Sequence, residues 1–381
     1  MRVFKKQYLL LCLAFTAYGA PKMNQFILPI VIPFSPAVVQ AYPIHRQHSV
    51  GVEIFKSQLV TPLSLLSITD NNKIKLEQFP LNEYDGGAHG IVPQNNPLLL
   101  ALRTKYGITV LDLEKKKKVV EYDTWLTKDL LAGLFQSKMV DSKKMLAISD
   151  IDPSADTDGL AYRGLHSLVL QDLLLNKTIS RVIVGYTYKG ETPPVFFASD
   201  VIIYKKDREN RDEPWKTLDN SLRPVEHQVG KILDEQCKSQ YIFDMAISAV
   251  HKCAVASCYD ETAQRSTLRF LSWQTNTVLE IPLHFHHVAQ ETRLMLSPSE
   301  KWVCVTACPD DHERNCYFAL IYLDPSLPDG FCKPIVFSPK NDRDIITWMT
   351  EPEGLVIFSE GHLSWWDLSK FDPHKPDADK K

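Results

Sequence analysis

Carboxylate side chains gather in one segment of the sequence at spacings that suit a hard cation. The segment carries Asp150, Asp152, Asp156 and Asp158. Its last part, Asp156-Thr157-Asp158-Gly159, alternates carboxylates before a glycine, as oxygen-ligand calcium loops do. The register of an EF-hand fails, because no glutamate stands at the closing position. We expect either a calcium site or a solvated turn here, and no other cofactor.

More carboxylates fall where further hairpin loops are expected. These carboxylates are Asp260, Glu261, Asp310, Asp311 and Glu313. Together with the segment from Asp150 to Asp158, we call them the acidic rim. If the loops emerge on one face of the fold, their combined field attracts basic partners or divalent cations. The alternative is a set of solvated hairpin tips.

Two histidines form a second candidate metal site. In Leu283-His284-Phe285-His286-His287, alternation along a strand places His284 and His286 on the same side. Two imidazoles on one side suit zinc or copper, but the sequence does not specify a third ligand. The alternative is a polar loop with hydrogen-bonded histidines.

The sequence carries no motif that commits it to catalysis. It has no GxSxG elbow, no phosphate-binding glycine loop, no HExxH and no kinase set. The net charge is -3 and the isoelectric point about 6.5, so no basic field points to nucleic acid. These features favour a binding protein over an enzyme, with a protein as the expected partner.

The first residues have the pattern of a secretory signal peptide. Arg2, Lys5 and Lys6 precede a short apolar run, and Ala17 and Gly19 suit cleavage before Ala20. We therefore expect residues 1–19 to be a signal peptide, no stable membrane span after cleavage, and a secreted or periplasmic protein. A cytoplasmic protein with an intact leader is the alternative.

Two kinds of cysteine are expected. Cys253 and Cys304 fall inside apolar runs and are predicted to be buried thiols. Cys308 and Cys316 flank one expected hairpin loop and are the best candidates for a disulfide.

A repeated pattern of strands and turns predicts the fold. The run Leu296-Ser297-Pro298-Ser299-Glu300-Lys301-Trp302 ends one strand and leads through a turn into the next. The segments from Val140 and from Ser248 repeat this order, and a strand ending in a polar residue follows each, as in Leu363-Ser364-Trp365-Trp366-Asp367. The units recur every 45–60 residues or so, which is the period of propeller blades.

These motifs resemble those of the WD-repeat family from about residue 50 to residue 368. In that family Ser-Pro-Asp-Gly-Lys precedes an apolar strand and Trp-Asp closes the next one. Ser297-Pro298-Ser299-Glu300-Lys301 is close to the first motif and Trp366-Asp367 matches the second. The resemblance implies an all-β fold, a β-propeller of four-stranded antiparallel blades.

Seven blades can be placed, with six or eight as alternatives. The last unit lacks an outer strand, so we expect Phe26–Ile32 or Val50–Phe55 to pair with the strand that contains Trp366. The predicted organisation is a signal peptide (1–19), an extended segment (20–47), a propeller (48–368) and a polar tail (369–381). It favours a protein-binding or assembly scaffold. The alternative is a metal-dependent hydrolase or lyase with its site at the propeller channel.

Overall fold

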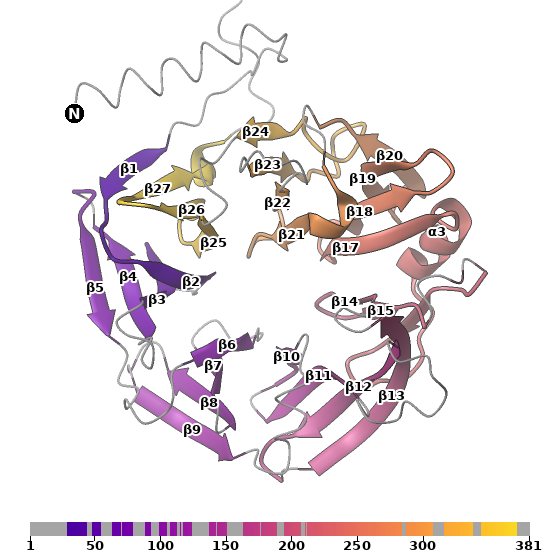
Figure 1. Ribbon diagram of the computed structural model, residues 1–381, viewed down its shortest axis with the longest axis horizontal. Coiled ribbons are helices and arrows are strands. Elements are labelled where there is room, and N and C mark those ends of the chain that lie inside the picture. Colours follow the sequence, from indigo (N-terminus) through magenta and orange to yellow (C-terminus); the bar gives the residue numbers. More distant parts are fainter. Residues whose placement is uncertain are drawn as a thin grey trace, which may run out of the picture.

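The computed structural model describes residues 29–371, apart from the following segments: 44–47, 55–62, 70, 79–87, 93–98, 105–106, 113–114, 116, 124–136, 142, 151–162, 176, 189–193, 207–209, 211, 284–286, 308–315 and 338–343. The described elements are strands, one α-helix, α3 (Gln228–Gln236), and two short 3-10 helices, η3 (Ala289–Glu291) and η4 (Leu368–Lys370). The sheets stand side by side in a ring (Figure 1). The predicted signal peptide lies outside the described residues.

The described strands form seven antiparallel sheets, six of four strands and one of three. In six of them the strands follow chain order: β2 (Val38–Pro43), β3 (Ser49–Ile54), β4 (Leu63–Ile68) and β5 (Ile74–Gln78); β6 (Ala88–Val92), β7 (Leu99–Thr104), β8 (Gly107–Asp112) and β9 (Lys117–Asp123); β10 (Ser137–Met139), β11 (Lys144–Asp150), β12 (Arg163–Asp172) and β13 (Lys177–Tyr188); β14 (Val195–Phe197), β15 (Ile202–Tyr204) and β16 (Lys216–Leu218); β17 (Gln240–Ser248), β18 (Cys253–Asp260), β19 (Arg265–Ser272) and β20 (Thr277–Ile281); β21 (Arg293–Leu296), β22 (Trp302–Ala307), β23 (Tyr317–Tyr322) and β24 (Ile335–Phe337).

The remaining sheet joins the two ends of the ring. Its order is β1 (Ile30–Pro33), β27 (His362–Asp367), β26 (Glu353–Ser359) and β25 (Ile345–Thr350). Ile30 pairs with Trp365 and Ile32 with Leu363, so a strand from the first predicted segment completes this sheet. The predicted closure is therefore confirmed. A strand that ends in proline suits the outer edge, because Pro33 lacks the N–H that an inner strand would use.

Apolar side chains fill the spaces between neighbouring sheets. Trp365 and Trp366 are both buried, and they point to opposite faces of β27. Trp365 packs with Val50 and Leu66 of the sheet β2–β5, while Trp366 packs with Phe318 and Leu320 of the sheet β21–β24. One strand thus connects the cores on both sides of its sheet.

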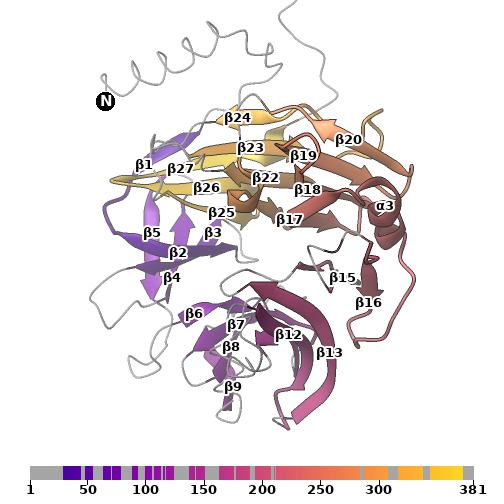
Figure 2. The same ribbon diagram turned by 45° about the vertical axis from the view of Figure 1, so that its right-hand side comes forward.

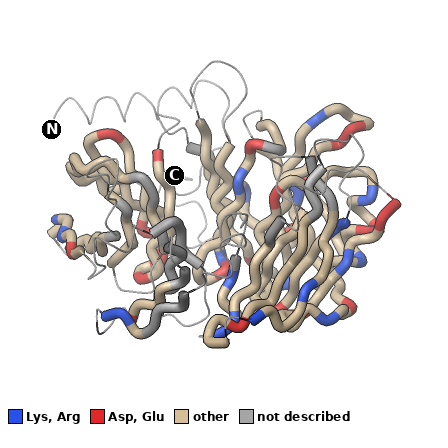
Figure 3. The backbone as a smooth tube through the Cα atoms, turned by 60° about the horizontal axis from the view of Figure 1, so that its bottom comes forward, with Lys and Arg blue, Asp and Glu red and all other residues tan. Residues whose placement is uncertain are grey.

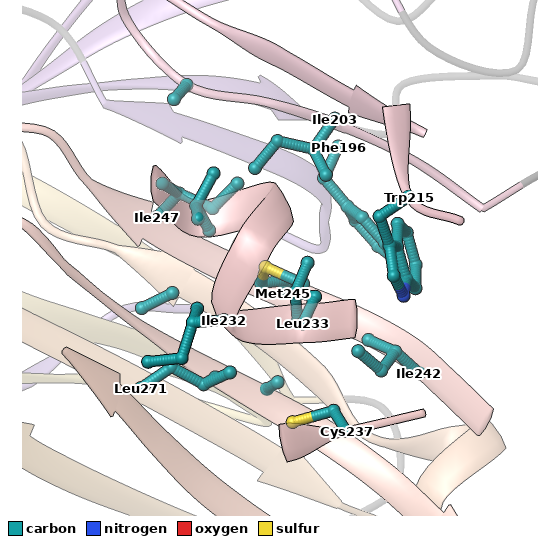
Figure 4. Close-up of a cluster of buried hydrophobic side chains, with 14 of the residues drawn as sticks. Phe196, Ile203, Trp215, Ile232, Leu233, Cys237, Ile242, Met245, Ile247 and Leu271 are labelled. Atoms are coloured by element: carbon teal, nitrogen blue, oxygen red, sulfur yellow. The ribbon is translucent and has the colours of Figure 1, made fainter. Parts of the chain in front are cut away.

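The helix α3 is an addition to the all-β fold expected from the sequence, in which the repeated units leave residues 221–239 unassigned. Its apolar residues Val229, Ile232 and Leu233 are spaced for one helical face. They pack between Trp215, beside the three-stranded sheet, and Met245 of β17 (Figure 4). The helix begins where the Val229 amide donates to Nδ1 of His227. It covers apolar surface that the short sheet leaves exposed.

Two boundaries differ from the expected organisation. The first four-stranded sheet begins at Val38, earlier than residue 48, because β2 pairs with β3. The expected tail begins with the packed turn η4, and the ring of Phe371 lies 4.8 Å from that of Trp302. Burial of aromatic surface holds this part of the chain against the sheet β21–β24.

Strand order fixes which loops share a face of the ring. Because the described sheets share an antiparallel order, the connections between their second and third strands lie on one face, and the described hairpin between β18 and β19 is one of them. Turns between first and second strands, and between third and fourth strands, leave on the other. Figure 2 shows the sheets turned by 45°. Acidic and basic positions are interspersed along the described chain (Figure 3).

Candidate binding surfaces

The described part of the acidic rim is the hairpin between β18 and β19. Asp260 ends β18 and accepts a hydrogen bond from the amide of Ala263 at 3.0 Å. That bond holds the pKa of Asp260 below its ordinary value. Glu261 is exposed at the tip of the hairpin. Asp260 therefore has a local role in shaping the turn, and the pair is accessible from solvent.

Most of the other predicted site residues lie outside the described residues. The backbone of Asp150 ends β11 and pairs with His166. The remaining predicted residues fall in segments that the structure does not describe: Asp152, Asp156, Asp158, His284, His286, Asp310, Asp311 and Glu313. The calcium site and the histidine site therefore stay predictions. Within the described ranges, no three His, Cys, Asp or Glu side chains come together to hold a metal ion.

A small polar depression lies beside the β18–β19 hairpin. Its volume is about 170 Å³, and it is lined by residues of β19 and β20 and by buried His287. Arg265 and Glu280 both line it and form an ion pair, with Nη2 of the arginine 2.8 Å from Oε2 of the glutamate. Ligand pockets usually measure roughly 300–1,000 Å³, so this one suits no more than a small group.

An exposed apolar surface lies on the hairpin of β12 and β13, on the outside of the ring (Figure 1). We call it the β12–β13 surface. It consists of Leu174 and Leu175 in the turn and Ile179 and Ile183 on β13, which are 60%, 70%, 48% and 46% exposed. The described residues contain nine exposed large apolar side chains, and four of them belong to this one hairpin. Apolar clusters of this kind mark protein-binding surfaces.

Two cations lie on the same strand as two of these apolar side chains. Lys177 and Arg181 of β13 are exposed, and neither forms an ion pair with another described residue. On β20, by contrast, the charge of Glu280 is paired with Arg265. The β12–β13 surface therefore combines apolar contact area with positive charge that no described residue neutralises.

The end of β13 is held against the next sheet. Gly185 has φ +133°, and a Cβ placed on it would overlap the carbonyl oxygen of Lys206. Only glycine permits this approach of two backbones. The strand pairs irregularly with β12 at two places, and Ser180–Ile183 is the regular stretch between them. The exposed part of β13 is thus held in place at its far end.

Comparisons with known proteins agree at the level of the fold. No family model and no curated protein matches the chain. Among solved structures, the mitotic checkpoint complex includes a chain with a TM-score of 0.52 at 12% identity, covering 91% of this chain and 94% of that one. An oligogalacturonate lyase from Vibrio parahaemolyticus has a TM-score of 0.53 at 8% sequence identity, and the match covers 89% of this chain and 97% of that one. An oligogalacturonate lyase in complex with manganese has a TM-score of 0.51 at 9% sequence identity, and the match covers 91% of this chain and 99% of that one.

The chain folds as a β-propeller. The four-stranded sheets are its blades, and the β12–β13 surface lies at the outer rim of one of them. Identities of 8% to 12% support the fold alone, because unrelated functions share it. The number of blades and the resemblance to the WD-repeat family stay predictions.

The β12–β13 surface could not be predicted from the sequence, for a physical reason. Alternation along a strand separates its two faces but does not say which face is covered. The signal that was present is the run Leu173-Leu174-Leu175 in an expected turn, where polar residues are usual.

Proposed function

We propose that the protein is a binding scaffold that holds a protein partner at the β12–β13 surface. The observation that carries this is the concentration of four exposed apolar side chains on one hairpin. Leaving such side chains in water is unfavourable by roughly 25 cal/mol for each Å² of apolar surface, so a partner that covers them gains that free energy. The paired elements beneath hold the surface in one shape, which lowers the entropy cost of binding.

The test compares two variants in partner capture. Leu174→Ser/Leu175→Ser removes apolar surface from the hairpin turn. Val250→Ser is the matched control, because Val250 is 69% exposed in a turn of another blade. We expect the double variant to lose captured protein by about tenfold or more while the control keeps it. Equal capture by the wild type and both variants would place binding elsewhere, and equal thermal stability of the variants excludes unfolding as the cause.

A second candidate function is that of a metal-dependent lyase or hydrolase. It is favoured by two propellers of similar fold that are named oligogalacturonate lyase, one of them with manganese. Its ligands on this chain would come from residues such as His284 and His286, or Asp152, Asp156 and Asp158. Incubation with oligogalacturonate and manganese, followed by ultraviolet detection of unsaturated products, tests it. Turnover that is abolished by His284→Ala/His286→Ala would support this function.

Export is part of the proposal. The predicted cleavage before Ala20 gives a secreted or periplasmic scaffold, whereas a cytoplasmic protein would keep Met1. No helix in the described ranges is long and apolar enough to cross a membrane. Mass spectrometry of the protein from its source cells determines the N-terminus. A chain that begins at Ala20 supports export, and an intact Met1 supports the cytoplasmic alternative.

A further inference from the structure

We propose that β13 binds an extended acidic segment of a partner protein as an additional β-strand. This inference rests on the proposed scaffold function and specifies how the partner is recognised. It follows from three features of β13: its outer edge, its cations, which form no ion pair with a described residue, and its exposed isoleucines.

The outer edge of β13 is available for pairing. The strand is the last of its sheet, so its outer backbone groups have no strand partner in the described part of the chain. Exposed strand edges recruit extended peptides through main-chain hydrogen bonds. The regular stretch Ser180–Ile183 sets the length of the expected ladder, since the pairing with β12 is irregular on both sides of it. The docked strand is therefore expected to be short.

Side chains on β13 specify what the docked strand carries. Arg181 and Ile183 are both exposed, and their cross-strand neighbours Val169 and Ser167 are buried on the same face. A residue docked opposite Arg181 gains from a carboxylate, and one docked opposite Ile183 gains from a β-branched apolar side chain. The expected motif is an acidic residue and an apolar residue separated by one position. Lys177, nearer the turn, pairs with Asp172 beyond the register shift, so it lies on the opposite face and adds only to the positive charge along the strand.

No other described outer strand exposes more than one large apolar side chain, whereas β13 exposes two. β9 also exposes a cation and an apolar residue one position apart, Lys117 and Val119, and β5 exposes Leu76. On β20 the charge of Glu280 is already paired with Arg265. The cations on β13 have an alternative role, since charged residues on an edge strand also prevent self-association. In that role they would repel a second copy without selecting an acidic partner. The two roles predict different responses to peptide charge.

The experiment uses the full chain and three labelled synthetic peptides of about eight residues, a usual strand length. The first peptide has Glu and Val in turn at every second position, with Thr at each position between them. The second has Lys in place of each Glu, and the third has Pro at two central positions. We expect the Glu peptide to bind about tenfold tighter than the Lys peptide in fluorescence anisotropy at low salt. The Pro peptide should fail, because it cannot form the ladder.

Charge reversal supplies the decisive control. In Lys177→Glu/Arg181→Glu the preference should invert, so that the Lys peptide binds better. Hydrogen exchange should show protection of β13 amides by the Glu peptide and no change on β9. Binding that ignores peptide charge, binding by the Pro peptide, or self-association of the charge-reversed variant without any peptide preference would each overturn strand addition.

The outcomes separate this inference from the scaffold proposal. If no peptide binds but Leu174→Ser/Leu175→Ser still loses its captured partner, the scaffold stands and strand addition is wrong. If the Glu peptide binds with the predicted preference while capture is insensitive to the hairpin variant, strand addition stands and the proposed partner surface is wrong.

Discussion

The carboxylate of Glu353 accepts a hydrogen bond from the hydroxyl of Ser299 at 2.7 Å and another from its amide at 3.1 Å. Glu353 begins β26, and Ser299 lies in the turn before β22, so these bonds join two neighbouring blades. The same relationship occurs one blade earlier, where Glu300 accepts from the hydroxyl of Ser248 and the amide of Val250 at 3.0 Å. The turns that predicted the repeat therefore also connect the blades.

A double-mutant cycle measures this connection. We expect Ser299→Ala and Glu353→Ala to couple by about 0.5–1.5 kcal/mol in the free energy of unfolding, as for a hydrogen bond near the surface. Urea unfolding of the wild type, both single variants and the double variant gives the coupling. Strictly additive effects would show that the bond between the blades adds nothing to stability.

Asp244 makes the stability depend on pH. Its two oxygens accept from the amides of Met245 and Leu294 at 2.8 Å, which connects β17 to β21. Burial raises the pKa of Asp244 above its ordinary value, more than the two amide bonds and nearby Arg293 lower it. The folded state thus holds this proton more tightly than the unfolded chain does. The stability that Asp244 contributes to the folded state is therefore present at acidic pH, and it is lost as the pH rises through the pKa of the folded state.

The comparison with Asp244→Asn isolates that contribution. The stability of the wild type minus that of the variant should decrease between about pH 4 and neutral pH, while other groups titrate equally in both chains. Chemical unfolding at several pH values measures the difference. A difference that grows as the pH rises would show that the folded protein favours the ionised carboxylate instead.

Lys138 connects β10 to the following blade. Its ammonium group donates to the carbonyl oxygens of Ala198 at 2.7 Å and Ser199 at 3.0 Å, and the side chain is buried. Lys138→Met should lower the free energy of unfolding by about 1–3 kcal/mol, because two carbonyl groups lose their donor. Lys144→Met is the control, since the side chain of Lys144 is 44% exposed and pairs with Asp141 only at 3.7 Å, and it should cost less than about 0.5 kcal/mol. Equal effects would contradict the role of Lys138.

The cysteines should differ in reactivity. Cys237, Cys253, Cys258 and Cys304 are buried free thiols, as predicted for Cys253 and Cys304, and burial raises the pKa of Cys253 to about 12. Cys332 is partly exposed. Because the thiolate is the reactive form, brief alkylation of the native protein should modify Cys332 first. Peptide mass spectrometry reads the sites, and rapid labelling of Cys304 would show that the blades open.

The same digest tests the predicted disulfide. Cys316 is disulfide-bonded, and its partner lies outside the described residues. A cross-linked peptide that joins Cys308 to Cys316 is expected without reduction. A link from Cys316 to any other cysteine would show the prediction to be wrong.

Much of the fold could be predicted because its determinants are local. Trp366-Asp367 and the turn around Pro298 mark strand ends, and the missing outer strand after Trp366 predicted the pairing with Ile30–Pro33. The helix α3 could not be predicted, because three spaced apolar residues over nine positions are too few to distinguish a short helix from a loop. The binding surface was missed because the exposure of Ile179 and Ile183 depends on neighbours distant in sequence.

The central claim is that a protein partner covers the β12–β13 surface. Site-specific photo-crosslinking tests it most directly, with a photoreactive amino acid at Ile183 or, as the control, at Val119 on the outer strand of another blade. After irradiation in the source cells, we predict a discrete protein adduct from position 183 and none from position 119. No adduct at position 183, or the same adducts at both positions, would contradict the claim.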